Sequence, residues 1–345
     1  MTSADGMKQG RVPAPGARVR VRVPASTANL GPGFDVLGLA LELYAWVELA
    51  AAPRTVIRLH GANLDGVPTD KTNLVYRVAQ QLFARAGVEV PELEIDIKSD
   101  IPLTRGLGSS ASAIVAALVA ANALVGTPFG ADELFRMASA WEGHPDNVGA
   151  SLFGGLVVAF WDGKRVDYLK VVPDERLEVL VAVPDFPLST KAARHALPDR
   201  VPMRDAVFNV GHASLLVGAL CCGRLDLLRV AMRDALHQPY RARLIPGLSR
   251  ILEEAEHHGA LGVALSGSGP TLLALVDRSE TRKAELEAFL LDTLAKENVP
   301  ARTMWLRPAV EGAVVLENGD VGVPFAQLAS AQAPSRVLSK GEVGA

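Results

Sequence analysis

The sequence predicts an α+β protein made of two layered domains, and three observations support this prediction. Segments in which apolar and polar residues alternate occur in both halves of the chain, and this pattern is typical of half-buried strands. Segments with the apolar spacing of helices stand between them. The composition, with 49% hydrophobic and 21% charged residues, is that of a globular protein. Its 345 residues are enough for two domains.

The first half of the chain begins with a Gly/Pro-rich segment, residues 1–17, which we expect to be a flexible lead-in. After it, alternating or apolar segments predict strands at 18–23, 37–50, 93–99 and 154–161. Helical spacing predicts helices at 73–87, where Gly87 is a C-terminal signal, and at 131–143. The prolines and glycines of residues 24–35 predict a loop between the first two strands.

The second half starts again near residues 165–175 with the same kinds of element. Strands are predicted at 177–184, 262–267, 271–276 and 301–307, and helices at 204–222, 225–236, 248–258 and 281–297. We therefore place one domain at residues 18–170, a second at residues 171–307 and a tail at residues 308–345.

Charge and composition exclude several classes of function. The net charge of −3 offers no broad basic surface for nucleic acid. The longest apolar run, residues 111–125, is too short to cross a bilayer, and the first residues lack the apolar core of a signal peptide. The only cysteines, Cys221 and Cys222, are adjacent and are expected to be buried and reduced. We expect a cytoplasmic protein with no membrane partner.

The stretch "LTRGLGSSASAIVAALVAAN", residues 103–122, joins a glycine loop to an apolar helix. The first amides of a helix lack intrahelical partners and carry a partial positive charge, so an anion such as phosphate binds there. Gly106 and Gly108 let the backbone come close to such an anion, and Ser109 and Ser110 can cap the helix or reach a metal. An ordinary turn with a serine cap is the alternative.

Two known phosphate loops compete for this stretch. The Walker A motif is absent, because no Gly-Lys is followed by Ser or Thr. The dinucleotide-binding pattern G-x-G-x-x-A matches at Gly106, Gly108 and Ala111, but "IPLTR" separates it from the preceding strand. No acidic residue ends a second strand about twenty positions later, so an oxidoreductase rests on this match alone.

Polar residues gather in two further stretches. "PASTANLGPGFDVLG" carries Asn29 and Asp35 and is either a substrate-binding loop or a turn with self-bonded side chains. "WEGHPDNVG" contains Glu142, His144, Asp146 and Asn147 within six residues. Glu142 lies near the C-terminal end of a predicted helix, where the dipole disfavours a carboxylate and a cation such as Mg²⁺ would offset it. A polar connector is the alternative, and the lack of a second histidine disfavours zinc.

Two arginines and a second glycine turn complete the candidates. Arg194 in "STKAAR" and Arg241 in "HQPYRARLIPG" suit a carboxylate substrate, although either can be a surface charge. The turn "SGSGPT" is a tight hairpin or presents its amides to a ligand. The G-x-S-x-G motif of many serine hydrolases is absent.

Taken together, these motifs resemble the GHMP small-molecule kinases. "PLTRGLGSSAS", the Asn/Asp loop and "SGSGPT" carry the family likeness. "VRVPASTANLGPGFDVLGLAL", "EGHPDNVGASLFGG", "STKAAR" and "HQPYRARLIPG" follow in the order found in its homoserine kinase branch. The match spans about Val19 to Trp305, and it does not include the lead-in or the residues beyond Pro308.

The resemblance implies a fold and a reaction. The N-terminal domain would be like the second domain of ribosomal protein S5, and the C-terminal domain would be ferredoxin-like. The chain would be a transferase, an ATP:L-homoserine O-phosphotransferase of threonine biosynthesis, with ATP as co-substrate and Mg²⁺ as cofactor. The oligomeric state stays open, and a homodimer is one arrangement.

The resemblance also implies the roles of particular residues. Mg²⁺ would be held by Ser110 and Glu142. ATP would be bound by Asn73 and by the loop residues Pro102, Leu103, Thr104, Arg105, Gly106, Leu107, Gly108, Ser109, Ser110, Ala111 and Ser112. Homoserine would be held by Asn29, Asp35, His144, Asn147, Thr190, Arg194, Arg241 and the backbone at Gly267. Either Asp146 acts as a base, or no base is used and Asn147 orients the hydroxyl; we favour the second.

Two other functions are compatible with the sequence. The chain could be another GHMP kinase, such as one acting on mevalonate or a sugar. It could also be an amino-acid-binding module that has lost catalysis, although intact Ser110 and Glu142 argue against this.

Overall fold

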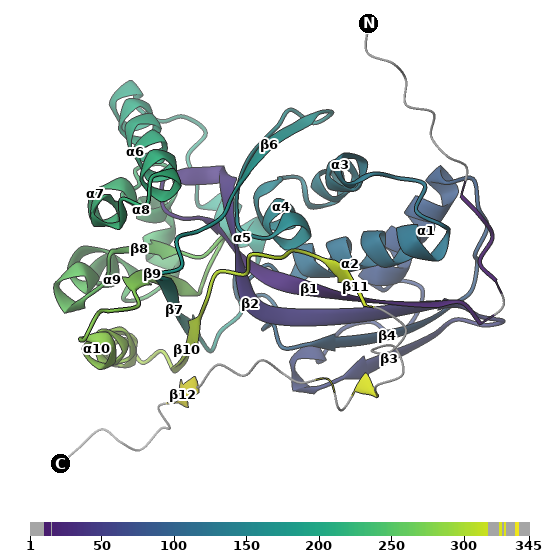
Figure 1. The fold of residues 1–345 in the computed structure, drawn as a ribbon. Helices are drawn as coiled ribbons and strands as arrows, with labels where there is room; N and C mark the ends of the chain where they lie inside the picture. Colours follow the sequence, from purple (N-terminus) through teal and green to yellow (C-terminus); the bar gives the residue numbers. More distant parts are fainter. Residues whose placement is uncertain (1–9, 15, 317–323, 326–327, 329–334, 338–345) are drawn as a thin grey trace, which may run out of the picture.

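The computed structural model describes residues 10–14, 16–316, 324–325, 328 and 335–337. It contains a seven-stranded and a five-stranded sheet, each with helices packed on it, and this confirms the predicted α+β class. The two sheets lie side by side, and the long strand β2 reaches from the first sheet to the second (Figure 1).

The first sheet has the order β11-β1-β2-β4-β3, with β5 added to the far end of β2 and β6 added to β5. All its pairs are antiparallel except β3 with β4. Its strands are β1 (Arg18–Asn29), β2 (Gly33–Ala51), β3 (Val56–His60), β4 (Leu93–Ser99), β5 (Leu156–Trp161), β6 (Val166–Val171) and β11 (Val314–Val315).

Four helices cover one face of this sheet: α1 (Leu74–Arg85), α2 (Ser109–Leu124), α3 (Ala131–Glu142) and α4 (Asp146–Phe153). A short 3₁₀ turn, η1 (Ala62–Leu64), precedes α1. Helix α2 is the central one, and Ala111, Ile114, Val115 and Leu118 on it are almost completely buried. Because α2 is apolar nearly all round, burial on every side holds its N-terminal end in a fixed place.

The second sheet is antiparallel, with the order β12-β10-β7-β9-β8. Its strands are β7 (Leu177–Pro184), β8 (Gly262–Leu265), β9 (Leu272–Asp277), β10 (Ala301–Leu306) and β12 (Ser335–Val337). One face packs on α9 (Leu248–Glu254), η4 (Ala255–His258) and α10 (Lys283–Lys296). The other face packs on β2 and on α6 (Met203–Cys221), η2 (Leu225–Leu227) and α7 (Leu228–Ala231).

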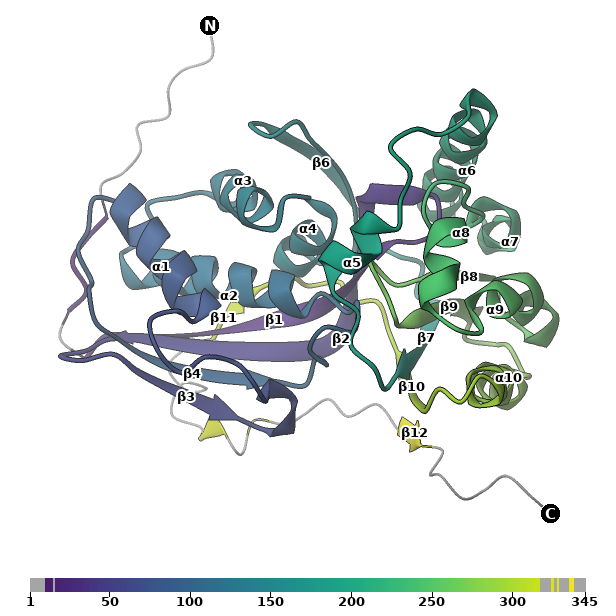
Figure 2. The same cartoon turned by 180° about the vertical axis from the view of Figure 1, so that it is seen from behind.

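The short helix α5 (Thr190–His195) has α4 on one side and α8 (Gln238–Arg241) on the other, and η3 (Ala242–Leu244) follows α8 (Figure 2). Each helix carries, at or next to its last residue, one of the two arginines that the sequence analysis offered as carboxylate partners. The limits of the two domains, which we set at residues 170 and 171, stay a prediction.

Several predicted elements differ from the structure. Strand β1 runs on through "PASTAN" to Asn29, so the expected loop shrinks to a tight turn at residues 30–32. Only residues 228–231 of the predicted helix at 225–236 are α-helical. Strands β3 and β6 and helix α4 were not predicted. The two cysteines are exposed rather than buried.

The described start of the chain and the segment that follows β10 are both attached to the first sheet and its helices. Gly10 and Arg11 donate backbone hydrogen bonds to Ala86 (3.1 Å) and Val125 (2.8 Å). Past β10, the Gly155 amide donates to Ala309 (2.7 Å), and β11 then pairs with β1. The described parts of the lead-in and of the tail are therefore held by hydrogen bonds. Among the described residues, no helix is long and apolar enough to cross a membrane.

A substitution at Gly38, on β2, can test how closely α4 packs against this strand. A Cβ at this position would lie 2.0 Å from the carbonyl oxygen of Asp146, a backbone atom that cannot easily move. We expect Gly38→Ala to lower the free energy of unfolding by about 1–3 kcal/mol through overpacking.

The matched control is Gly211→Ala, because nothing lies within 4 Å of a Cβ at this position in the middle of α6. We expect it to be neutral or stabilising by about 0.5–1 kcal/mol. Urea unfolding of both variants checks the pair, and equal effects would contradict the close packing of α4.

Candidate active site

The turn between β1 and β2 holds two polar side chains in an uncommon backbone conformation. Asn29 (φ 72°) and Asp35 (φ 57°) both have left-handed torsions. The buried Asn29 side chain donates from Nδ2 to the Gly267 carbonyl (2.9 Å) and accepts from the Asp35 amide at Oδ1 (3.0 Å). These hydrogen bonds offset the energetic cost of the strained backbone and fix the orientation of both side chains.

The glycine loop reaches the start of α2 as the sequence predicted. Gly106 (φ 81°) and Gly108 (φ 71°) are both left-handed. A Cβ on Gly108 would lie 2.1 Å from Ser26 Oγ, so only glycine allows this approach to β1. Among the described residues no side-chain hydrogen bond caps α2 at Gly108, so its first amides can bind an anion.

The second glycine turn is joined to the first. Ser266 Oγ donates to the Gly106 carbonyl (2.6 Å), and the Thr271 amide donates to the Arg105 carbonyl (3.2 Å). The Gly267 amide donates to Ala28 of β1 (3.1 Å). The turn therefore holds the glycine loop against β1, and it leaves Gly267 and Ser268 beside the pocket.

Glu142, the last residue of α3, meets Ser110, in the first turn of α2. Ser110 Oγ donates to Glu142 Oε2 (3.0 Å). Burial raises the pKa of Glu142, while His144 and the Ser110 hydrogen bond act in the opposite direction. Among the described residues no cation forms an ion pair with Glu142, so its negative charge is poorly compensated.

The start of α4 carries a connected set of three polar side chains. Asp146 Oδ1 accepts from the Asn147 amide (2.7 Å) and lies 2.7 Å from His144 Nδ1. Ser26 Oγ donates to the side-chain oxygen of Asn147, Oδ1 (2.9 Å). The side-chain nitrogen, Nδ2, is therefore the Asn147 atom left for a ligand. Burial opposes protonation of His144, but the Asp146 hydrogen bond and the nearby carboxylates outweigh it and raise its pKa to about 9.

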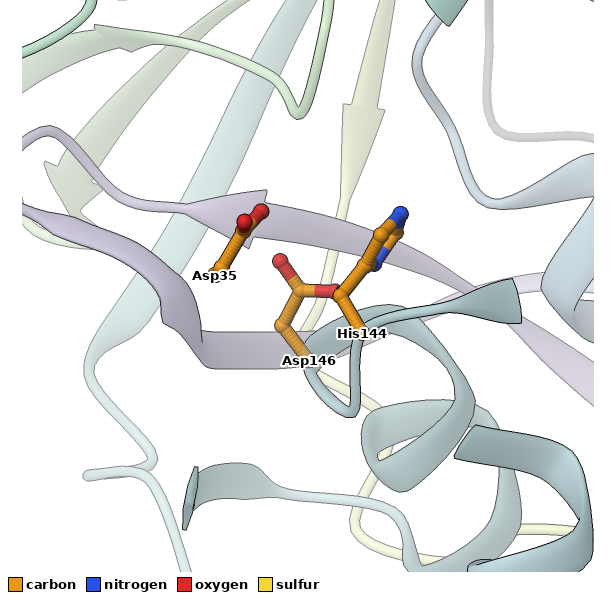
Figure 3. Close-up of side chains that lie close together, drawn as sticks. All are labelled: Asp35, His144 and Asp146. Atoms are coloured by element: carbon orange, nitrogen blue, oxygen red, sulfur yellow. The ribbon is translucent and has the colours of Figure 1, made fainter. Parts of the chain in front are cut away.

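Asp35, His144 and Asp146 bring one potential metal-ligand atom each to within 4.8 Å of one another (Figure 3). Their atoms are already engaged, since Asp35 is bound by Arg194 and Asp146 by His144 and Asn147. With its pKa raised to about 9, His144 must lose a proton before it can coordinate a metal, and this disfavours coordination at neutral pH. This group is therefore better described as a charge network than as a metal site.

The two predicted arginines differ in their surroundings. Arg194, which is partly exposed, forms a two-pronged ion pair with Asp35 (2.7 and 3.0 Å). Arg241 is only 2% exposed and has no carboxylate partner among the described residues. Burial, and then the charge of Arg194, lower the pKa of Arg241 to about 10.

These side chains share one pocket of about 230 Å³. It collects all the residues predicted to bind the substrate or the metal or to take part in catalysis, together with the centre of the glycine loop. Of the predicted residues it is lined by Asn29, Asp35, Thr104, Gly106, Gly108, Ser109, Ser110, Glu142, His144, Asp146, Asn147, Thr190, Arg194, Arg241 and Gly267.

A second pocket of about 430 Å³ continues from the first, because Thr104, Ser109 and Ser110 line both. It is mainly apolar and includes Leu103, Ser112 and Asn73. Asn73 is buried at the start of α1, where its side chain accepts from the Val75 amide (2.8 Å) and donates to the Pro68 carbonyl (2.7 Å).

The remaining predicted residues lie elsewhere. Pro102 and Arg105 line a third cavity of about 520 Å³, toward the second sheet. Leu107 and Ala111 are completely buried and line none of these three pockets.

Sequence reasoning missed several residues of the site. Ser189 and Ser268 line the pocket beside Thr190, and both lie within motifs that we had quoted. Phe34 lies in the stretch "PASTANLGPGFDVLG". The guanidinium carbons of Arg194 and Arg241 lie over its ring, 5.6 and 5.4 Å from the ring centre. His237 contacts Arg241, and its place in "HQPYR" was a signal that could have been followed.

Comparison with known proteins identifies close relatives. Residues 73–155 match the model of the GHMP kinases N terminal domain, and residues 216–292 match that of the GHMP kinases C terminal domain. A homoserine kinase of Carboxydothermus hydrogenoformans is 45% identical over 301 residues, which are 87% of this chain and 97% of that protein. A homoserine kinase of Deinococcus radiodurans is 45% identical over 302 residues, 88% of this chain and 98% of that protein.

The fold of this chain is also similar to those of solved kinase structures. The crystal structure of a homoserine kinase from Cytophaga hutchinsonii superimposes with a TM-score of 0.78 at 28% identity, covering 92% of this chain and 100% of that one. A mevalonate kinase structure, at 17% identity and a TM-score of 0.60, covers 85% of this chain and 99% of that one and shares the fold.

The protonation of His144 can be measured directly. With a pKa raised from 6.5 to about 9, protonated His144 stabilises the fold fully below pH 6.5, and this contribution is lost as the pH rises through about 9. We expect an NMR titration of the ring nitrogens, in protein free of divalent ions, to show this high midpoint. Asp146→Asn should lower it. A midpoint at or below 6.5 in the unmodified protein would show that burial outweighs the carboxylates.

Proposed function

This chain belongs to the homoserine kinases of the GHMP kinase family, and we propose that it transfers the γ-phosphate of ATP to the side-chain hydroxyl of L-homoserine. The product is O-phospho-L-homoserine. The observation that carries this proposal is the pocket itself, in which Arg194, Arg241 and Asp35 lie beside the uncapped start of α2. It offers partners for an amino acid next to a place for phosphates.

The substrate is a zwitterion, and the pocket has a partner for each of its charges. The carboxylate pairs with Arg241 and Arg194, and the ammonium group pairs with Asp35. Arg194 and Asp35 bind each other in the structure described here. Homoserine therefore replaces the Arg194–Asp35 ion pair with a new partner for each of these two side chains, and it adds a third ion pair with Arg241. When the ligand leaves, Arg194 and Asp35 bind each other again.

ATP occupies the apolar pocket and the glycine loop. The adenosine lies in the second pocket near Asn73, and the phosphates extend past Thr104, Ser109 and Ser110 to the start of α2. The loop amides and the helix dipole hold the negative charge there. Since the two pockets share these three residues, the terminal phosphate is delivered to the amino-acid pocket.

Ser110 and Glu142 suit a Mg²⁺ ion. Both offer oxygen ligands, which this hard cation prefers, and they lie at the phosphate end of the pocket. Burial raises the pKa of Glu142, which forms no ion pair among the described residues, so a bound cation would stabilise its charged form. When bound, Mg²⁺ neutralises charge on the ATP phosphates.

The hydroxyl of homoserine is oriented by Asn147 rather than deprotonated by Asp146. Asp146 Oδ1 is already engaged, because it pairs with a protonated His144 and accepts a hydrogen bond from the Asn147 backbone amide. The free side-chain nitrogen of Asn147 can donate to the hydroxyl oxygen, so that it faces the phosphate. Phosphoryl transfer needs positioning and charge neutralisation more than covalent help.

A coupled assay of ADP release tests the proposal. Purified protein with Mg²⁺ and ATP is offered L-homoserine, mevalonate, galactose or L-serine in parallel, and we expect turnover with homoserine to exceed the others. Preferential turnover of another acceptor would identify a different GHMP kinase. Binding of homoserine without ADP release would identify a catalytically inactive module.

Arg194→Ala removes one of the two carboxylate partners. We expect the KM for homoserine to rise about 100-fold, because a charge-assisted hydrogen bond is lost, while the KM for ATP changes little. Lys191→Ala, on the exposed face of the same helix, is the control and should behave like the unmodified protein. Unchanged KM values in Arg194→Ala would refute the assignment of the carboxylate.

Glu142→Gln keeps the size of the side chain but removes its charge. We expect kcat to fall at least about 100-fold and the Mg²⁺ concentration for half-maximal rate to rise, because a charged ligand is lost. Glu133→Gln, on the same helix but outside the pocket, is the matched control. A Glu142→Gln enzyme with normal turnover and normal Mg²⁺ dependence would exclude Glu142 as the ligand.

A further inference from the structure

Within the part of the chain that the structure describes, the buried guanidinium of Arg241 is hydrogen-bonded by neutral groups alone. Its Nη1 donates to the Gly267 carbonyl (3.0 Å) and contacts His237 Nδ1 (3.1 Å), and its Nε donates weakly to the Ala193 carbonyl (3.4 Å). Among the described residues, nothing accepts a hydrogen bond from Nη2, although Arg241 lines the pocket. The side chain is thus fixed at one edge and open to a ligand at the other.

The contacts of His237 determine its protonation state. Its Nε2 lies 2.8 Å from the Gly31 carbonyl, which can only accept, so Nε2 carries a hydrogen. Its Nδ1 faces Arg241 Nη1, which can only donate, so Nδ1 is unprotonated. His237 is therefore the neutral Nε2–H tautomer. Burial favours the same state, since it lowers the pKa of this completely buried ring.

Surrounding groups hold His237 in place. Asp234 accepts from the amides of Leu236, His237 and Gln238 (2.7–3.0 Å), which fixes the segment that leads into α8. The Phe34 ring stacks on the imidazole with ring centres 5.2 Å apart. The histidine is therefore a rigid bridge between α8 and the β1–β2 turn.

We propose that His237 is a positioning residue that sets Arg241 for the substrate carboxylate. At one end it accepts from the guanidinium, and at the other it donates to the carbonyl of Gly31, in the turn that separates Asn29 from Asp35. It thus fixes the distance between the cation that binds the carboxylate and the polar groups that bind the ammonium end. This inference rests on the function proposed above.

Two substitutions separate the two ends of the bridge. His237→Gln places its amide near the position of Nε2, so it keeps a donor for Gly31 but loses the acceptor for Arg241. His237→Asn places its oxygen near the position of Nδ1 and keeps the acceptor for Arg241. His257→Gln, at an exposed histidine outside the pocket, is the control.

Each variant is assayed with L-homoserine and with its carboxamide, in which a neutral amide replaces the carboxylate. We expect His237→Gln to raise the KM for homoserine roughly 10- to 100-fold, the value of one charge-assisted hydrogen bond, with kcat within about threefold. The KM for the carboxamide and for ATP should change less than about threefold. His237→Asn should keep the KM for homoserine within about threefold of the unmodified protein.

The proposal would be overturned if His237→Gln raised the KM for homoserine and the KM for its carboxamide equally, or if it raised neither. If the unmodified protein does not phosphorylate homoserine at all, the proposed function fails instead, so the two failures are distinct. Should the variants not fold, ¹⁵N NMR of the unmodified protein decides at neutral pH. A proton on Nε2 and none on Nδ1 of His237 supports the bridge, and a proton on Nδ1 refutes it.

Discussion

The site depends on a hydrogen-bonded junction between β1 and two glycine turns. Ser26 and Ala28 of β1 bond to Leu107 (3.2 Å) and Gly267 (3.1 Å), and Ser266 ties one turn to the other through Gly106 (2.6 Å). The start of α2 packs with the first sheet, and the two arginines lie on the side of the second sheet. Without this junction, nothing would fix the distance between the start of α2 and the arginines. Because it joins them, the phosphate end and the amino-acid end can be rigid at the same time.

The charges of the pocket balance before any ligand enters. With His144 protonated, it and the two arginines face Asp35, Asp146 and Glu142. A zwitterionic substrate leaves that balance unchanged, since it adds one charge of each sign. The nucleotide adds negative charge, and Glu142, which has no ion-pair partner among the described residues, lies at the end where a cation would enter with it. The pocket is therefore neutral as a whole before ligands bind, and the charge that a metal must neutralise is that of the nucleotide.

Much of this site could be predicted from the sequence, because its residues lie in contiguous motifs whose local chemistry is explicit. The turn of Gly106 and Gly108 and the buried helix after it follow from backbone freedom and periodicity. The continuation of β1 through Pro24 to Asn29 could not be predicted in this way, because cross-strand pairing with β2 overrode the local proline and glycine signals. Helix α4 was missed because its start is polar, and its packing on Gly38 is a tertiary contact.

The bridge at His237 belongs to a class of feature that local patterns cannot reveal, since its two partners are four and 206 residues away. It also explains why the two arginines are not equivalent. Arg194 sits on a six-residue helix, is partly exposed and can exchange Asp35 for a ligand. Arg241 has no carboxylate to exchange and cannot swing away, because its backbone, its carbonyl acceptor and its histidine are all buried. Arg241 therefore supplies the fixed reference for the carboxylate, and Arg194 closes on a substrate that is already placed.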